Sequence, residues 1–333
     1  MDRITQTMDS GDSIIEQDRR FYEKQIAPMI HTDFTAYEKR IAVGVVGEGS
    51  DCFGYDDEIS RDHDFGIGVC LWITDDDAQC IGEQLQKRYQ EMLFEWIHKN
   101  PEILNSPEIL SKYLVQRRGV MTIRKFYETI LGFRIDPANP TVNNAAWFYT
   151  DEWKFAAATN GIVFCDELGQ FSSIRNAILQ YYTEKVWRMR LTNELHEFSA
   201  AMQANYARCM ARGDLIASNF CKTRSIDAAM NILFLLRRTF APYYKWKFRA
   251  FRELDGSEEL VLLLEEAVVM QPDLNHWKDY TYDPRRINTS DPLLMQFEQI
   301  AEILADCLYA CGLINNHEQY LKAHCTSIAS GIK

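Results

Sequence analysis

Residues 46–66, VGEGSDCFGYDDEISRDHDFG, place glycines and carboxylates between two apolar runs. The first run, residues 40–47 (RIAVGVVG), predicts a buried strand. The second run, residues 62–74 (DHDFGIGVCLWIT), predicts a central strand after an acidic start, because its other side chains are apolar or small. Four kinds of connection have such a composition: a calcium loop, a dinucleotide-binding turn, a solvated acidic loop and a divalent-metal site for nucleotide chemistry.

The first two alternatives fail on spacing. A dinucleotide-binding turn requires G-x-G-x-x-G between a strand and a helix. Gly47 and Gly49 fit this pattern, but Cys52 stands at the third glycine position, and an acidic loop follows instead of a helix. An EF-hand loop that began at Asp62 would need Glu at its twelfth position, where the chain has Ile73. The solvated loop and the metal site therefore remain.

Two aspartates at alternate positions favour the metal site. Alternate residues of a strand project to one face, so the carboxylates of Asp62 and Asp64 repel each other unless a cation lies between them or one is protonated. A solvated loop accounts for residues 56–58 but not for this pair. We expect Asp62 and Asp64 to bind Mg²⁺ (or Mn²⁺), which prefers carboxylate and phosphate oxygens. We expect Gly49 and Ser50 to bind nucleotide phosphates through N–H groups and a hydroxyl, since a side chain at the glycine would block the approach.

The turn, eleven further residues and the acidic pair with His63 between its members resemble the nucleotidyltransferase signature of the DNA polymerase beta superfamily. The longer run GEGSDCFGYDDEISRDHDFG is similar to a bacterial family of unknown function related to kanamycin and other aminoglycoside nucleotidyltransferases. The resemblance continues in RFYEKQIAPMI, NGIVFCDELGQFSSIR, ARGD and FAPYYKW, and so spans most of the chain. It implies an α+β fold, with a small mixed-sheet nucleotidyltransferase domain followed by an all-helical bundle domain that binds the acceptor.

The resemblance also implies an activity: Mg²⁺-dependent transfer of a nucleoside monophosphate from an NTP, with ATP as the expected donor, to an acceptor hydroxyl, releasing pyrophosphate. Two features depart from the superfamily. His63 replaces a residue that is usually apolar, and we expect it to pair with the acidic loop. No acid occurs in residues 119–126, where a third carboxylate is expected. Asp166 is the nearest candidate for this third catalytic carboxylate, and a cap of the next helix is its alternative role. Without a third acid, the chain could be a nucleotide-binding regulatory or interaction protein of the same fold.

The change of sequence pattern along the chain, from mixed strand and helix to helix alone, predicts the domain limits. Residues 1–28 form an amphipathic leading helix that we expect Pro28 to end, residues 29–172 form the nucleotidyltransferase domain, and residues 173–333 are helical throughout. In the helical part, we expect Asp214 to cap a helix rather than act as a base. Lys245 lies among aromatic residues (PYYKWKFR), which suits either a nucleotide phosphate or base contact or a packed corner.

The amino-acid composition limits the kinds of partner that the chain is expected to bind. The chain has 333 residues and a formal net charge of -12, which argues against general nucleic-acid binding because such affinity comes from neutralising phosphates. Its nine cysteines show no paired spacing and its first residues carry no apolar signal segment, so we expect a cytoplasmic protein with reduced thiols. No apolar run is long enough for a membrane span. The acceptor stays open: a cationic small molecule suits the acidic surface, and a protein or a nucleotide-derived acceptor is equally compatible.

Overall fold

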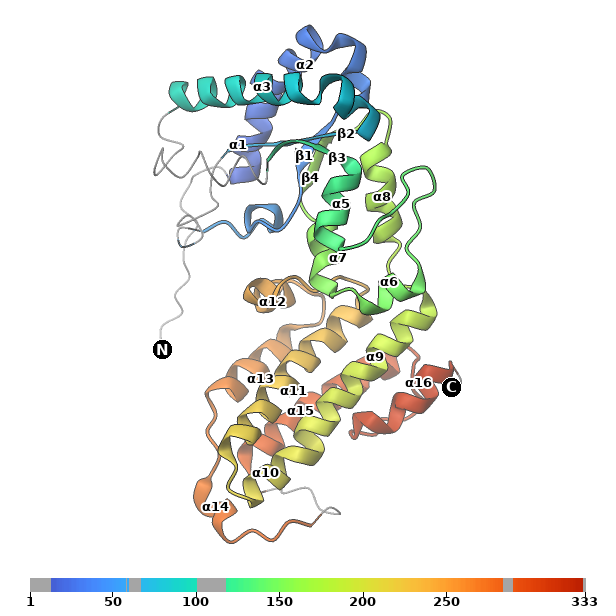
Figure 1. Cartoon of the computed structure of the whole chain (residues 1–333). Helices are drawn as coiled ribbons and strands as arrows, with labels where there is room; N and C mark the ends of the chain where they lie inside the picture. Colours follow the sequence, from blue (N-terminus) through green and yellow to red (C-terminus); the bar gives the residue numbers. More distant parts are fainter. Residues whose placement is uncertain (1–12, 58, 60–66, 101–117, 284–289, 332–333) are drawn as a thin grey trace. The chain divides into compact units, whose positions relative to one another are not determined.

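The computed structural model describes residues 13–57, 59, 67–100, 118–283 and 290–331 (Figure 1). These residues form a mixed α+β structure, as expected from the sequence. The chain divides into two compact units, the first comprising Met1–Ala146 and Lys154–Gln180, the second Trp147–Trp153 and Tyr181–Lys333. Residue 172, our expected domain limit, lies inside helix α8 (Gln170–Leu179) of the first unit, and the three predicted domain ranges remain predictions.

The first unit contains a four-stranded mixed sheet in the order β3-β2-β1-β4. Strand β1 runs antiparallel to β2 and β4, and β2 runs parallel to β3. The C-terminal end of β1 therefore lies beside the starts of β2 and β4, and the start of β3 lies at the same end; we call it the turn end of the sheet. The strands are β1 Ala42–Val45, β2 Cys70–Ile73, β3 Gly119–Thr122 and β4 Ile162–Cys165.

The leading helical segment continues beyond the point where we expected it to stop. Helix α1 (Ile14–Phe21) passes through a π-helical turn, η1 (Tyr22–Ile26), into α2 (Ala27–Asp33). Pro28 occupies the first turn of α2, where a missing backbone N–H is tolerated, so the expectation that it ends the helix is wrong. A short 3₁₀ segment, η2 (Thr35–Arg40), then leads into β1.

Helix α3 (Asp75–Lys99) follows β2 and buries one face. Its N-cap is Thr74, whose hydroxyl accepts a hydrogen bond from the Asp77 N–H at 3.1 Å. Asp75, Asp76 and Asp77 lie in the first turn, where their negative charges interact favourably with the positive end of the helix dipole. The side chains on the buried face recur every four residues, as an amphipathic helix requires: Ile81, Leu85, Tyr89 and Leu93.

An aromatic cluster joins the sheet to the next helices of the first unit. Helix α5 (Ile123–Leu131) follows β3, and α8 follows β4. Trp72 of β2 stacks on Phe171 of α8 with ring centroids 3.8 Å apart. The Tyr127 hydroxyl of α5 donates a hydrogen bond to the Phe171 carbonyl at 3.1 Å, so this buried phenol is satisfied.

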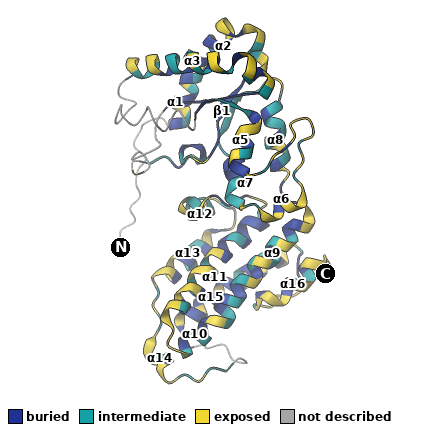
Figure 2. Cartoon of the chain, in the orientation of Figure 1, coloured by how far each residue is buried: buried dark blue, intermediate teal, exposed yellow. Residues whose placement is uncertain are grey.

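The second unit is helical throughout its described residues. Helix α11 (Leu215–Leu236) contacts α9 (Glu184–Phe198), the π-helical segment η7 (Ser199–Tyr206) and α15 (Pro292–Ala310). Figure 2 shows buried residues along all three of these α-helices. The second unit also contains α10 Ala207–Ala211, α12 Tyr244–Phe251, α13 Glu258–Val269, α14 Leu274–Lys278, η8 Leu321–His324 and α16 Cys325–Ser330.

The predicted helix cap at Asp214 in the second unit is confirmed, and a second aspartate caps another helix. Asp214 caps α11 by accepting a hydrogen bond from the Ala217 N–H at 3.0 Å. Asp291 caps α15 in the same way through Leu294, at 2.9 Å. The boundary between the units falls in α6 (Asn144–Tyr149) and α7 (Glu152–Thr159). No helix in the described part of the chain is long and apolar enough to cross a bilayer.

Close packing at the turn end gives the first prediction. A Cβ added to Gly161 would lie 1.9 Å from the Val45 carbonyl oxygen, and its φ is +62°. A Cβ at Gly132 (φ +80°) would meet no atom within 4 Å. Gly132→Ala is expected to lower the free energy of unfolding by about 1 kcal/mol through backbone strain alone. Gly161→Ala should cost at least about 2 kcal/mol more, because β1 and β4 must separate. Denaturant unfolding measures both, and equal losses would contradict the described pairing.

Candidate functional site

The predicted phosphate turn follows β1 directly. After Val46 the chain passes through Gly47, Glu48, Gly49 and Ser50 into a 3₁₀ turn, η3 (Asp51–Phe53). The Ser50 carbonyl accepts hydrogen bonds from the N–H groups of Phe53 at 3.1 Å and Tyr55 at 2.9 Å. The Ser50 hydroxyl has no hydrogen-bond partner among the described residues and is half-buried. Its backbone is therefore fixed while its side chain stays available.

Asn160 pins the beginning of this turn. Its Oδ1 accepts a hydrogen bond from the Gly47 N–H at 3.0 Å, and its Nδ2 donates to the Gly47 carbonyl at 2.7 Å. The side-chain amide thus extends the β1–β4 pairing by one step. Arg175 in turn donates to the carbonyls of Thr159 at 2.6 Å and Asn160 at 3.3 Å, which anchors the segment before β4.

Packing inside the turn explains the glycine at position 49. A Cβ there would lie 2.0 Å from Oδ1 of Asp51. The same carboxylate oxygen accepts a hydrogen bond from the Cys52 N–H at 2.8 Å. Gly49 is therefore required by the position of the Asp51 side chain, and its contact with phosphate remains a prediction.

A buried ion pair holds η3 against the start of β3. Arg118, 7 % exposed, precedes β3 and donates a short hydrogen bond from Nη2 to Oδ2 of Asp51. The same guanidinium lies 3.5 Å from the Cys52 sulfur. Burial is the largest effect and opposes the charge on Arg118, but the combined attraction of Asp51 and the other acidic groups around it outweighs burial and raises the guanidinium pKa. This pair has no sequence signal, because its members are 67 positions apart and no motif contains both.

Helix α1 also contributes to the turn end. The Asp18 carboxyl is fully buried, and its Oδ1 accepts a hydrogen bond from the Gly68 N–H at 2.8 Å. Burial raises the pKa of Asp18 well above its usual value, although Arg118 opposes this shift. At the helix start, Oδ2 of Asp56 accepts the Ile14 N–H at 3.1 Å. The start and the middle of α1 are thus tied to the connection between β1 and β2.

The structure describes only some of the predicted site residues. Gly49 and Ser50 lie at the turn end, whereas Asp62, His63 and Asp64 lie outside the described residues. Within the described residues, no group of three or more His, Cys, Asp or Glu side chains could hold a metal ion. Asp62 and Asp64, the predicted metal ligands, do not belong to this part of the chain.

Asp166 lies far from the turn along the sheet. Cys165, the last residue of β4, pairs with Val43 near the start of β1, so Asp166 follows at the end of the sheet opposite to Ser50. Its Oδ2 accepts a hydrogen bond from the Ser172 N–H of α8 at 2.7 Å, as a capping residue does. The structure does not bring Asp166 together with the turn.

The remaining predicted residue, Lys245, belongs to the second unit. It lies exposed on α12, and its Nζ is 5.0 Å from the centroid of the Trp246 ring. The nearby Lys247 is more engaged: its Nζ lies 2.6 Å from Oδ1 of Asp227 on α11. Lys245 therefore retains a free ammonium beside an aromatic face, and its nucleotide contact remains a prediction.

A buried polar cluster in the second unit had no sequence signal. Burial raises the pKa of Glu152 to about 7, against an attraction from Arg190. The Tyr181 hydroxyl lies 3.4 Å from Oε1 of Glu152. Burial also raises the pKa of Glu194, whose Oε2 accepts a hydrogen bond from Asn231 at 3.2 Å. These side chains come from α7, α9, α11 and the segment between α8 and α9, so spacing along the chain could not reveal them.

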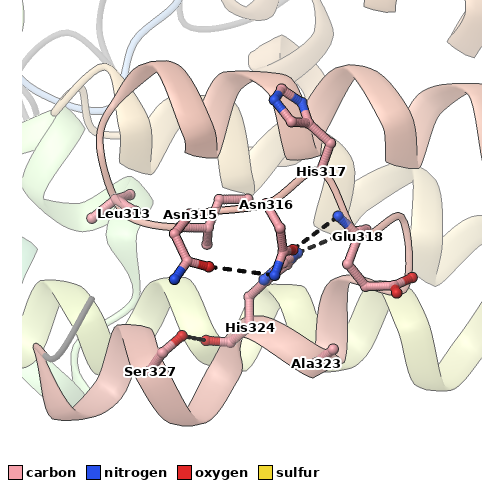
Figure 3. A pocket seen from close by; sticks show the side chains of 9 residues that line it. Leu313, Asn315, Asn316, His317, Glu318, Ala323, His324 and Ser327 are labelled. Carbon is pink, nitrogen blue, oxygen red and sulfur yellow. Dashed lines mark hydrogen bonds between the residues drawn. The ribbon is translucent and has the colours of Figure 1, made fainter.

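A cavity of about 540 Å³ lies near the C-terminus of the second unit (Figure 3). Its polar groups largely satisfy one another. Nε2 of His324 lies 2.8 Å from the Glu318 carbonyl, and Nδ1 of His317 lies 2.5 Å from Oδ1 of Asp306 on α15. Internal hydrogen bonding leaves it few groups to direct at a ligand. It is lined by Leu313, Ile314, Asn315, Asn316, His317, Glu318, Ala323, His324 and Ser327.

Comparison with known proteins gives one family. Residues 147–247 match the family described as Domain of unknown function (DUF4037). This segment is less than a third of the chain; it includes Glu152, Asp166 and Lys245 but not the turn after β1. No curated protein and no solved structure matches the chain. The resemblance to a family of unknown function thus holds for the matched segment.

The ion pair gives the second prediction. Arg118→Met leaves the Asp51 carboxylate buried without its partner and is expected to lower the free energy of unfolding by about 3–5 kcal/mol. Adding Asp51→Asn removes that charge and should restore at least about 1 kcal/mol, a positive coupling in a double-mutant cycle. Urea unfolding of the four proteins measures the coupling. Additive losses would show that the two side chains do not interact.

The raised pKa of Glu152 gives the third prediction. Because the pKa of Glu152 in the folded protein, about 7, exceeds its ordinary value of 4.5, the group stabilises the fold fully below about pH 4.5, and this contribution is lost as the pH rises through 7. The free energy of unfolding should fall by about 2 kcal/mol between pH 5 and 8, and Glu152→Gln should flatten this fall. Exposed Glu258→Gln is the control and should follow the wild type. An unchanged slope in Glu152→Gln would refute the assignment.

Proposed function

We propose that the chain is a Mg²⁺-dependent nucleotidyltransferase that moves a nucleoside monophosphate from an NTP, ATP by preference, to an acceptor hydroxyl and releases pyrophosphate. One observation carries the proposal: Gly49–Ser50 directly follows β1, and β1 and β2 are antiparallel, so the turn lies at the end of the sheet where the chain enters β2. Asp62 and Asp64 precede β2 in the sequence. We therefore propose that this acidic pair lies beside the turn.

Two described carboxylates at this end of the sheet already have partners. Asp51 is paired with Arg118, and Asp56 accepts a helix N–H, so both are already engaged. The Ser50 hydroxyl has no partner among the described residues. We propose that Asp62 and Asp64 hold the metal. The positive charge of a bound metal ion would offset the negative charge of the triphosphate.

Each protein group then has a defined role. The N–H group of Gly49 and the hydroxyl of Ser50 bind phosphate oxygens and orient the triphosphate. Arg118 does not touch the nucleotide; through Asp51 it keeps the turn in one conformation. Such fixed donors need no rearrangement when charge develops at the phosphate.

A nucleotide-binding protein without turnover is the second candidate. The location of Asp166 favours this binding-only protein. Asp166 follows the end of β4 that lies away from the turn, so it is not placed to act as a third carboxylate beside Gly49 and Ser50. The two functions share a binding step and differ in pyrophosphate release.

The test measures both steps. Purified protein is incubated with each NTP, Mg²⁺ and a panel of hydroxyl-bearing acceptors, and pyrophosphate is quantified. Asp62→Asn and Asp64→Asn should each lower the rate at least about 100-fold, since the metal contributes several kcal/mol. Ser50→Ala should lower it about tenfold. Asp76→Asn, at an exposed residue of α3, is the matched control and should keep the wild-type rate.

Calorimetry with a non-hydrolysable NTP separates the candidates. Tight Mg²⁺–nucleotide binding without pyrophosphate release supports the binding-only protein. Release that survives both aspartate substitutions rejects the proposed site, and absence of binding rejects both candidates.

A further inference from the structure

Helix α12 and the residues at its two ends are biased toward positive charge and aromatic rings. Residues 243–252, YYKWKFRAFR, contain four cations, five aromatic side chains and no acid, in a chain whose formal net charge is -12. The acids Glu253 and Asp255 come only after this stretch. Salt screens charges that lie more than about 10 Å away, so an anion that touches α12 responds mainly to the local cations.

Three of these cations share one side of the helix. Lys245, Arg249 and Arg252 stand at positions i, i+4 and i+7, which recur on one helix face. Another side of α12 packs on the bundle: Phe251 is fully buried, and its ring centroid lies 6.2 Å from that of Phe234 on α11. The three cations therefore form a stripe away from this packed side.

Aromatic rings lie on both sides of the stripe. The centroid of the Trp246 ring is 5.0 Å from Nζ of Lys245 and 5.9 Å from Cζ of Arg249. Beyond the other edge, Cζ of Arg252 lies 4.7 Å from the centroid of the Phe248 ring. Cations and rings thus alternate over this part of the helix surface, and each charge lies next to an apolar surface.

Tyr244 adds a widely open ring at the start of the helix. Its side chain is 75 % exposed, and its ring centroid is 4.2 Å from that of Tyr243, which is 42 % exposed. Exposed aromatic side chains that gather in one place commonly mark a binding surface. We call the three cations of the stripe, together with Tyr244, Trp246 and Phe248, the α12 face.

Neighbouring acids neutralise only part of this charge. Glu265 of α13 pairs with Arg252, and Asp227 of α11 pairs with Lys247, which is not part of the α12 face. Lys245 forms no ion pair with a carboxylate among the described residues. An exposed ion pair such as that of Arg252 is weak, so a phosphate can replace its carboxylate partner.

We propose that the α12 face binds a short single-stranded nucleic acid, with phosphates on the three cations and bases against the aromatic rings, foremost Tyr244. This combination of backbone charge and stacking is typical of single-strand binding surfaces. The stretch from Tyr244 to Arg252 rises about 12 Å, which corresponds to about four nucleotides at about 3.4 Å each.

Two other anionic partners fit the surface less well. An acidic peptide matches the charge but brings no flat ring for every open aromatic side chain. An anionic membrane favours a continuous apolar face, whereas three cations occupy the middle of the exposed side of α12. The α12 face lies wholly within the second unit, and its binding does not rest on the proposed transferase activity.

The test titrates fluorescein-labelled octathymidylate with the full-length protein in EDTA, so that neither a metal nor an NTP takes part. Fluorescence anisotropy at 50 mM salt should give a Kd below about 100 µM. Three phosphate contacts predict that log Kd rises with log salt with a slope of about 2, since each releases about 0.7 counterion. An abasic octamer, which has the same phosphates and no bases, should bind at least about fivefold more weakly.

Two variants locate the binding through different readouts. Tyr244→Ala should weaken octathymidylate at least about fivefold and leave the salt slope unchanged, because it removes stacking alone. Lys245→Gln should weaken it about fivefold at 50 mM salt and lower the slope by about 0.7. The matched controls Phe94→Ala, on α3, and Lys322→Gln, on η8, also change exposed side chains and should bind as the wild type does.

Four results would overturn the proposal. These are no saturable binding of octathymidylate, equal binding of the abasic octamer, wild-type binding by both Tyr244→Ala and Lys245→Gln, and binding of phosphatidylserine vesicles in place of the oligonucleotide. Both variants change exposed side chains, so their thermal unfolding should match that of the wild type and a loss of binding will report on the surface.

Discussion

The buried ion pair between Arg118 and Asp51 is the constraint on which the turn end of the sheet depends. Buried charges are tolerated only in pairs, so the position of one side chain dictates that of the other. Asp51 also accepts the Cys52 N–H and occupies the space above Gly49. A single carboxylate thus joins the 3₁₀ turn to the start of β3 and sets the residue type two positions earlier. Asn160 completes the arrangement at Gly47.

The same contacts alter the electrostatics of the acidic stretch. Its sequence suggests a dense negative field between β1 and β2, but the charge of Asp51 is paired with an arginine, and Asp56 accepts a helix N–H. Asp18, which approaches from α1, is held in an environment that disfavours its charge. The field that a triphosphate would meet is therefore weaker than composition indicates. Under the proposed function, Asp62 and Asp64 supply the carboxylates that hold the metal.

Local features were predictable from the sequence where local physics decides them. Apolar runs predicted strands where β1 and β2 lie, and Asp214 was expected to cap a helix and caps α11. One local expectation was wrong. A π-helical turn allowed Pro28 to begin a new helix instead of ending one. This outcome depends on how the neighbouring segment packs, which no propensity encodes.

The candidate site was predictable only in part. Gly49 and Ser50 could be placed after a strand from the pattern alone. The partners that fix them could not, because Arg118 and Asn160 lie far from them in the sequence and only the folded sheet brings them together. Strand order decided the position of Asp166: proximity to a strand suggested a catalytic acid, but antiparallel pairing with β1 put it at the other end of the sheet.

The contacts that fix the turn have a consequence for biosynthesis. Ile14 bonds Asp56 and Asp18 bonds Gly68, so the earliest part of the chain can dock once the β1–β2 connection has been made. Gly47 must wait for Asn160, 113 residues later, and Asp51 for Arg118. Chains emerge from the ribosome N-terminus first, at about 5–20 residues per second. The nascent turn therefore spends several seconds without its anchors, with Asp51 still hydrated, and acquires its final shape only when β3 and β4 join the sheet.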